Sequence, residues 1–237
     1  APKILCFGDS LTQYGVRSGA WVQRLISATE AKADVVVRGF SGYNSVQALS
    51  LLPTLPTDCE NGVVIIWFGA NDAALETNKV QHVPVPVYTE TLKTMVAHFT
   101  EAGVPSDRVV LMSPPPVNDA TYMDQFCKPR SIDPVDRTRE RTGDYVDACG
   151  SVAKELGTRF VHLYKAFAAE QEGLTPDSYN GLFVDGLHLS NRGQKVVSKA
   201  LSATLKGEGE EQTDISPESM PFWFPHWSTL VAYDAEQ

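Results

Sequence analysis

An apolar run passes into a polar turn in the stretch Ile4-Leu5-Cys6-Phe7-Gly8-Asp9-Ser10-Leu11-Thr12. The run predicts a short buried strand, and Gly8 permits the sharp turn that ends it. Ser10 then follows at the carboxyl end of the strand, the edge at which open α/β sheets bind ligands. Backbone amides in such a turn favour the negative charge that develops when a serine attacks a carbonyl. Taken alone, the Gly-Asp-Ser-Leu letters also fit an ordinary helix cap.

A carboxylate precedes a histidine by three positions near the other end of the chain, in Phe183-Val184-Asp185-Gly186-Leu187-His188. On a turn or first helical coil, residues three apart face the same way, so Asp185 can accept a hydrogen bond from one nitrogen of His188. The other nitrogen is then free to act as the general base that a serine nucleophile needs. An isolated Asp-x-x-His is more often a turn former followed by a structural histidine.

Two further predicted strands end in polar, glycine-containing turns. The most apolar strand covers 63–68 and leads into Gly69-Ala70-Asn71-Asp72, and another covers 35–38 and leads into a turn containing Gly42. The side-chain amide of Asn71, the N–H of Gly42 and the N–H of Ser10 would together form an oxyanion hole. The alternatives are that Asn71 only caps a helix or forms an Asx-turn, and that Gly42 only supplies a positive φ.

These four strand-end motifs, in this order, resemble the SGNH (GDSL-type) hydrolase family, and the resemblance spans about residues 4 to 205. Each motif is short, but their joint occurrence is specific. The residues in these motifs are most similar to those of the isoamyl acetate-hydrolysing esterase branch. The resemblance implies Ser10 as nucleophile, His188 as base and Asp185 as the residue that orients it, with Gly42 and Asn71 in the oxyanion hole.

Predicted strands alternate with predicted helices, which implies parallel pairing through right-handed crossovers. The expected strands cover 4–7, 35–38, 63–68, 108–112 and 159–163, and the expected helices cover 21–31, 45–52, 87–102, 135–156, 164–171 and 190–205. The predicted fold is therefore α/β, a three-layer α/β/α sandwich with a five-stranded parallel sheet. This is a flavodoxin-like arrangement, and it is the fold that the resemblance implies. The Gly-x-Ser-x-Gly elbow of α/β-hydrolases is absent from the sequence.

The composition changes after residue 205, which predicts a division into a hydrolase domain at 1–205 and an appendage at 206–237. An acidic, glycine-containing linker covers 207–212, and large apolar side chains crowd into 220–227. Because an exposed tail of that kind promotes aggregation, we expect it to dock. One alternative is plain docking on its own domain. The other is that it closes the pocket or crosses to a second subunit to make a homodimer, as a C-terminal tail does in the resembling branch.

The proline-rich stretch 113–117 leaves the same predicted sheet edge as the motifs, so we expect it to wall a substrate pocket. The residues expected to line this pocket are Pro115, Val117, Phe126, Phe222 and Trp223. Such apolar walls favour a short-chain, uncharged ester, such as an acetate of a small alcohol. The alternatives are a lysophospholipase or thioesterase, a sugar O-acetylesterase, or a non-catalytic binding protein on the same fold.

Charge and composition restrict the partners. The chain has 237 residues, 43% of them hydrophobic, and a net charge of -9, which argues against nucleic acid and anionic membrane surfaces. No apolar run approaches the roughly 20 residues that span a bilayer. The expected partner is a small-molecule ester.

Cysteine and histidine spacing gives no indication of a metal or other cofactor, and we expect none. The four cysteines are widely separated, and we expect reduced thiols and a cytoplasmic protein. A leader removed before the first residue would leave no trace in this sequence.

Overall fold

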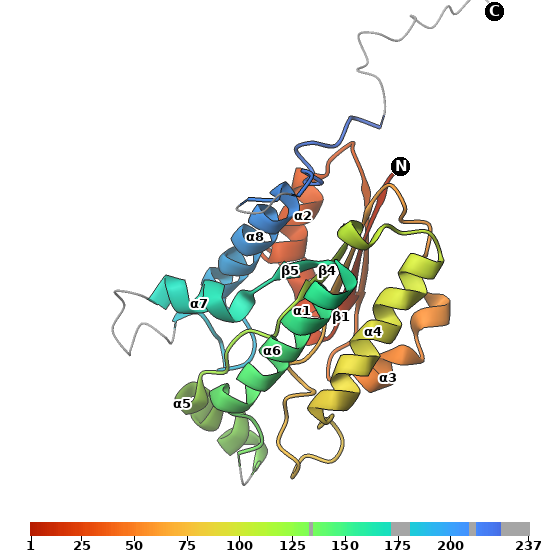
Figure 1. Cartoon of the computed structure of the whole chain (residues 1–237). Helices are drawn as coiled ribbons and strands as arrows, with labels where there is room; N and C mark the ends of the chain where they lie inside the picture. The colour runs from red at the N-terminus through yellow and green to blue at the C-terminus, as the bar shows by residue number, and fades with distance from the viewer. Residues whose placement is uncertain (133–134, 172–180, 209–211, 224–237) are drawn as a thin grey trace, which may run out of the picture.

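A five-stranded parallel sheet runs through the middle of the molecule (Figure 1). The computed structural model describes residues 1–132, 135–171, 181–208 and 212–223. The strands are β1 (Lys3–Gly8), β2 (Asp34–Gly39), β3 (Val63–Trp67), β4 (Val109–Met112) and β5 (Arg159–Val161). Their order across the sheet is β2-β1-β3-β4-β5, and every neighbouring pair is parallel. The predicted flavodoxin-like sheet is confirmed.

Helices cover both faces of the sheet (Figure 1). One face carries α2 (Trp21–Ala28), α7 (Leu163–Gln171) and α8 (Asn191–Lys206), and the other carries α3 (Ser45–Leu49), α4 (Val85–Glu101) and α6 (Arg139–Leu156). Shorter helical turns are α1 (Ser10–Gln13), η1 (Tyr14–Val16), η2 (Leu52–Thr54), η3 (Ser106–Arg108), α5 (Asp119–Thr121), η4 (Tyr122–Cys127) and η5 (Lys128–Arg130). Among the described residues, no helix has the length and apolar character needed to cross a bilayer.

The alternation of side chains along β1 explains the two cores. Ile4 and Cys6 point into the cluster that contains α2 and α8, whereas Leu5 and Phe7 point into the cluster under α4 and α6. A strand that is apolar at every position therefore buries both of its faces, which is what a central parallel strand requires.

The carboxyl ends of three strands lie level with one another. Gly8 at the end of β1 pairs with Gly39 at the end of β2 and with Trp67 at the end of β3. Because the strands are parallel, the turns that follow them meet at one edge of the sheet. This register brings together sequence motifs that are about 30 residues apart.

Two helices, α4 and α6, begin two or more residues away from the predicted positions, whereas α7 and α8 begin within one residue of theirs. α4 begins at Val85 rather than residue 87, because proline is tolerated in the first turn of a helix, where its missing N–H has no partner to lose. α6 begins at Arg139 rather than residue 135, because the side chain of Thr138 caps it by accepting from the N–H of Arg141 at 3.1 Å. Arg137 consequently precedes the helix, and its side chain is buried.

The described part of the C-terminal appendage, 212–223, lies against α8 and the α2–β2 connection (Figure 1). Ile215 and Met220 are buried, the N–H of Ile215 donates to the carbonyl of Leu205 at 2.9 Å, and Lys32 donates to the carbonyl of Pro217 at 2.9 Å. The rest of the aromatic tail, 224–237, lies outside the described residues. A homodimer contact through the tail stays a prediction.

Candidate active site

Ser10 is the first residue of α1 and is separated from the end of β1 by Asp9 alone. The carboxylate of Asp9 caps this turn by accepting from the N–H of Leu11 at 2.8 Å, which fixes the backbone on both sides of the serine. The N–H groups of a first helical turn have no partner within the helix, so the amide of Ser10 remains available to an anion. Ser10 itself is only 5% exposed.

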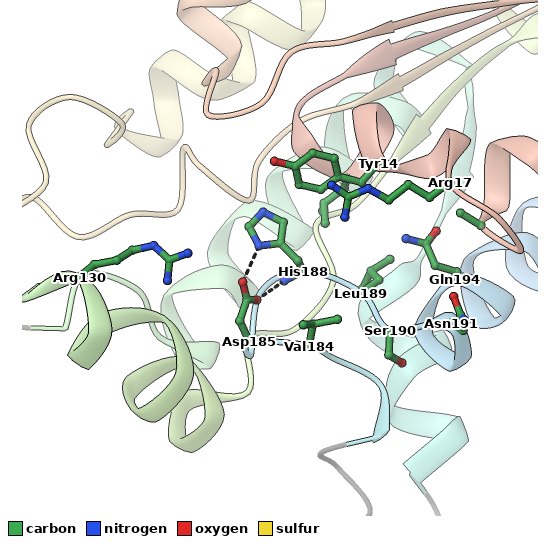
Figure 2. A pocket seen from close by; sticks show the side chains of 12 residues that line it. Tyr14, Arg17, Arg130, Val184, Asp185, His188, Leu189, Ser190, Asn191 and Gln194 are labelled. Carbon is green, nitrogen blue, oxygen red and sulfur yellow. Dashed lines mark hydrogen bonds and ion pairs between the residues drawn. The ribbon is translucent and has the colours of Figure 1, made fainter.

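A chain of hydrogen bonds joins Ser10 to His188 and Asp185. The Oγ of Ser10 lies 3.1 Å from Nε2 of His188. Nδ1 of His188 lies 2.8 Å from Oδ2 of Asp185, a contact that Figure 2 shows. An ionised carboxylate can only accept, so Nδ1 carries the proton of the second contact. Nε2 is then left as an acceptor for the hydroxyl proton of Ser10.

Asp185 and His188 lie on a tight loop closed by the antiparallel bridge between Phe183 and Leu189. Gly186 has a φ of +85°, and a Cβ at this position would overlap the backbone of Tyr122. Only glycine lets the loop approach so closely, and the N–H of Asn118 donates to the carbonyl of Gly186 at 2.9 Å. The segment after β4 thus holds the histidine loop in place.

The charge of Asp185 is stabilised locally. Burial by itself would raise its pKa, but the hydrogen bonds from the ring and N–H of His188 and from the N–H of Leu187 outweigh burial and leave the pKa below its ordinary value. Asp185 is therefore ionised at neutral pH and can orient the histidine ring.

Asn71 and Gly42 come from the turns after β3 and β2 and lie at the same sheet edge. The side-chain amide of Asn71 donates one hydrogen to the carbonyl of Tyr43 at 2.8 Å, which leaves its second N–H for another acceptor. Gly42 has a φ of +84°, and its carbonyl accepts from Gln81 at 2.9 Å. Their joint action with Ser10 as an oxyanion hole stays a prediction.

Sequence reasoning missed Arg137 and Gln81, which bond directly to Asn71. Oδ1 of Asn71 accepts from Arg137 at 3.2 Å and from Gln81 at 3.1 Å. Arg137 lies in an irregular stretch 66 positions from Asn71, and an arginine outside any motif is normally assigned to the surface. No local signal in the sequence marks it as buried.

Two buried carboxyl groups lie behind the nucleophile. Burial raises the pKa of Asp9 to about 7, and burial likewise raises the pKa of Asp72 to about 6. Asp72 accepts from the N–H of Ser45 at 2.9 Å and from its hydroxyl, so it ties the start of α3 to the turn after β3. Both acids therefore hold the turns after β1 and β3 in shape through hydrogen bonds, and neither is hydrogen-bonded to His188.

The raised pKa of Asp9 predicts a pH dependence of stability. Its folded pKa lies above its ordinary value, so the folded state holds the proton more tightly, and stability falls as pH rises toward about 7. We expect the free energy of unfolding to fall by about 2 kcal/mol more in the parent than in Asp9→Asn between pH 5 and pH 8. Urea titrations at the two pH values measure this difference, since Asp72 titrates in both proteins. Parallel pH profiles would contradict it.

A cavity of about 540 Å³ opens beside His188 and Asp185 (Figure 2). It lies between η1, the histidine loop and the start of α8. Its other lining residues are Leu11, Tyr14, Arg17, Ala20, Arg130, Val184, Leu189, Ser190, Asn191 and Gln194. The lining mixes aliphatic, aromatic and polar side chains, whereas the sequence led us to expect an apolar pocket.

The predicted pocket residues are mostly elsewhere. Pro115 and Val117 are buried and do not line this cavity, because the segment after β4 turns inward and Val117 joins the core. Phe126 does lie beside the site, with its ring centre 6.1 Å from that of His188. Phe222 and Trp223 lie beside Lys32 and Ala31, near the amino end of β2 and hence away from Ser10, so the prediction that they line the pocket is wrong.

A Ser–His–Asp hydrogen-bonded chain at the carboxyl edge of a parallel sheet is typical of hydrolases that use a serine nucleophile. Comparison with known proteins supports this class, because the model of the GDSL-like lipase/acylhydrolase family matches residues 6–196. The chain belongs to this family and is a carboxylic ester hydrolase. The resemblance drawn from the four motifs is confirmed.

Relatives match over nearly the whole chain. A GDSL esterase/lipase of Arabidopsis thaliana is 40% identical over 97% of this chain and 93% of its own length. An isoamyl acetate-hydrolyzing esterase 1 homolog of Mus musculus is 34% identical over 97% of this chain and 88% of its own length. The crystal structure of a lipase/acylhydrolase from Enterococcus faecalis is similar with a TM-score of 0.65, at 26% identity, over 87% of this chain and 96% of that one.

Proposed function

We propose that the protein hydrolyses short-chain carboxylic esters, of the acetate type, through a Ser10–His188–Asp185 triad. The observation that carries the proposal is the hydrogen-bonded chain from Oγ of Ser10 through the ring of His188 to Asp185, at 3.1 Å and 2.8 Å. Serine is a weak nucleophile until a positioned base removes its proton, and this geometry supplies the base.

In the proposed reaction, Oγ of Ser10 attacks the ester carbonyl while Nε2 of His188 takes the hydroxyl proton. The carbonyl oxygen becomes an oxyanion held by the N–H groups of Ser10, Gly42 and Asn71. His188 then gives the proton to the departing alcohol, which leaves an acyl-serine. A water molecule, deprotonated by His188, attacks this ester, and the acid and free Ser10 are released.

The acetate preference is supported by the relatives. The mouse relative, which is 34% identical, is named as a homolog of an isoamyl acetate-hydrolyzing esterase. A lysophospholipase would need a continuous apolar groove for a long acyl chain, whereas the cavity beside His188 has arginine, asparagine and glutamine side chains in its wall. We therefore place the acyl limit at short chains.

The experiment that tests the proposal is hydrolysis of p-nitrophenyl esters from acetate to palmitate. We expect kcat/KM to be highest for the two- to four-carbon acyl groups and to fall by about tenfold or more at longer chains, since the polar side chains in the cavity wall leave no continuous apolar surface for added methylenes. Activity that rises toward palmitate would favour a lysophospholipase or thioesterase. Absence of hydrolysis at every length would favour a non-catalytic binding protein.

Sugar O-acetyl esters are a second candidate substrate, because the cavity wall suits a hydroxylated alcohol. Tyr14 presents an aromatic ring 5.5 Å from that of His188, and Asn191 and Gln194 supply amide groups. Aromatic faces and amides are the groups that bind sugars through stacking and hydrogen bonds. Release of acetate from an acetylated monosaccharide with a higher kcat/KM than from isoamyl acetate would establish this second candidate.

Replacing Asn71 tests the oxyanion hole. Removal of one oxyanion donor lowers turnover by about 100- to 1,000-fold in enzymes of this chemistry, because the charge exists only in the transition state. We therefore expect Asn71→Ala to lower kcat by that factor with little change in KM. Steady-state kinetics on p-nitrophenyl acetate measure both constants, and an unchanged kcat would remove Asn71 from the mechanism.

A further inference from the structure

The amide of Asn71 offers oxygen and nitrogen in nearly the same shape, so something must decide which one faces the reacting ester. A nitrogen that faces the ester donates to the oxyanion, whereas an oxygen in that place would repel it. The described contacts settle the orientation, because both lone-pair positions of Oδ1 are used by donors from Arg137 and Gln81. Nδ2 is thereby turned toward Tyr43 and the site.

Arg137 is suited to this task because it is buried, charged and fully hydrogen-bonded. It is 2% exposed. Its five N–H groups donate to the carbonyl of Ala70 at 3.1 Å, to Oη of Tyr122 at 2.7 Å, to Oδ2 of Asp136 at 2.9 Å, to Oδ1 of Asn71 at 3.2 Å and to Oε1 of Gln81. A guanidinium whose donors are all used cannot rotate without losing several bonds at once.

The charge of Arg137 is balanced away from the reacting atoms. Asp136 accepts from Nη1 of Arg137, whereas Asn71 accepts from Nη2, and the Asp136 carboxylate also accepts from Tyr122 at 2.6 Å and from Asn78 at 2.6 Å. The side chains of Arg137 and Asp136 are 3% and 5% exposed, so the pair is shielded from water and salt. The cation is thus held in place, and it polarises the amide of Asn71 through Oδ1.

Gln81 also holds Gly42, the second predicted oxyanion donor, through a hydrogen bond. Its Nε2 donates both to Oδ1 of Asn71 and to the carbonyl of Gly42, while its Oε1 accepts from Arg137. One half-buried side chain therefore connects the turn after β3 with the turn after β2. The two donors cannot move apart unless Gln81 breaks a contact.

We propose that Arg137, acting with Gln81, is a positioning residue that fixes the amide of Asn71 with its N–H toward the oxyanion. The proposal rests on the proposed esterase function and deepens it, because it assigns the oxyanion hole a support that no motif of the sequence contains. Arg137 touches neither the substrate nor Ser10 in this role. It acts through Asn71.

The test uses Arg137→Lys, which keeps the positive charge beside Asp136 but loses the fork that reaches Asn71 and Gln81. We expect kcat for p-nitrophenyl acetate to fall by about 10- to 100-fold with KM nearly constant, since a small misplacement of a transition-state donor costs rate rather than ground-state binding. Gln81→Met, at a half-buried position, should lower kcat in the same way. Failure of both variants to change kcat would overturn the proposal.

Arg159→Lys is the matched control. Arg159 is fully buried and donates to the carbonyls of Asp107, Thr204, Leu205 and Thr213, so it has a comparable structural role at the far end of β5. Arg159→Lys should lower stability and leave kcat unchanged. A loss of kcat equal to that of Arg137→Lys would mean that general loosening, rather than positioning, explains both.

A double-mutant cycle separates action through Asn71 from other roles. In an Asn71→Ala background, Arg137→Lys should change kcat by less than about twofold, because the group it positions is absent. Full additivity of the two changes in log kcat would overturn the proposal.

The ¹⁵N-detected side-chain amide signals of Asn71 give a readout that needs no substrate. They should shift and broaden in Arg137→Lys but not in Arg159→Lys. Unchanged Asn71 signals would refute the positioning role even if esterase activity were never found. Altered signals in a protein that hydrolyses no ester would instead refute only the proposed function.

Discussion

Ser10→Ala should lower kcat for p-nitrophenyl acetate by about 10⁵- to 10⁶-fold while leaving the fold intact. Ser10 is 5% exposed and its Oγ bonds only to His188 among the described residues, so removal of the oxygen leaves a small gap and one imidazole nitrogen that water can solvate. The loss is large because, in the part of the chain that the structure describes, Ser10 supplies the only hydroxyl that is hydrogen-bonded to His188. The residual rate would come from water held by the oxyanion hole.

The control for this variant is Ser27→Ala, which removes an exposed serine on α2 that bonds only to the carbonyl of Gln23. It should match the parent in kcat and KM. Circular dichroism should show the same helix content for both variants. Equal activity of Ser10→Ala and the parent would remove Ser10 as nucleophile and bring the binding-protein interpretation forward.

Asp185→Asn should lower kcat by about 10⁴-fold at neutral pH. The asparagine Oδ1 can still accept from the N–H groups of Leu187 and His188, so the loop keeps its shape. Its NH₂ group, however, would face Nδ1 of His188 and force that nitrogen to accept. The proton would then reside on Nε2, which could no longer take the proton of Ser10.

Asp214→Asn is the matched change, because Asp214 also accepts from a backbone N–H, that of Ser216 at 2.8 Å, but lies in the appendage against α8. It should leave kcat unchanged. Steady-state kinetics of the two variants at pH 7 provide the comparison. Activity of Asp185→Asn within about tenfold of the parent would show that another group orients His188.

The parts of the site that lie directly after strands were predictable from the sequence. Parallel pairing places such turns at one sheet edge, so the positions of Ser10, Gly42 and Asn71 follow once the strands 4–7, 35–38 and 63–68 are recognised. The contact between Asp185 and His188 follows from their three-residue spacing alone. These features depend on local pattern and topology.

The pocket was not predictable, because it depends on which way side chains turn after a strand ends. Val117 follows β4 at the expected edge, yet its side chain enters the core. Phe222 and Trp223 were expected to be covered, yet they are 69% and 53% exposed beside Lys32 and Ala31. The burial of Arg137 was not predictable, because the hydrogen bonds that stabilise it come from other segments, chiefly from Asn71 and Tyr122.

The hydrogen bond between Ser10 and His188 joins positions 178 residues apart. During synthesis, a ribosome-bound chain that already displays Ser10, the proposed nucleophile, must wait for the histidine loop, which the segment after β4 holds in place. The growing polypeptide therefore carries an inert serine through most of its translation. Under the proposed triad, catalytic competence follows the arrival of the histidine loop, so the appearance of esterase activity would mark the completion of the fold more faithfully than the appearance of helix content.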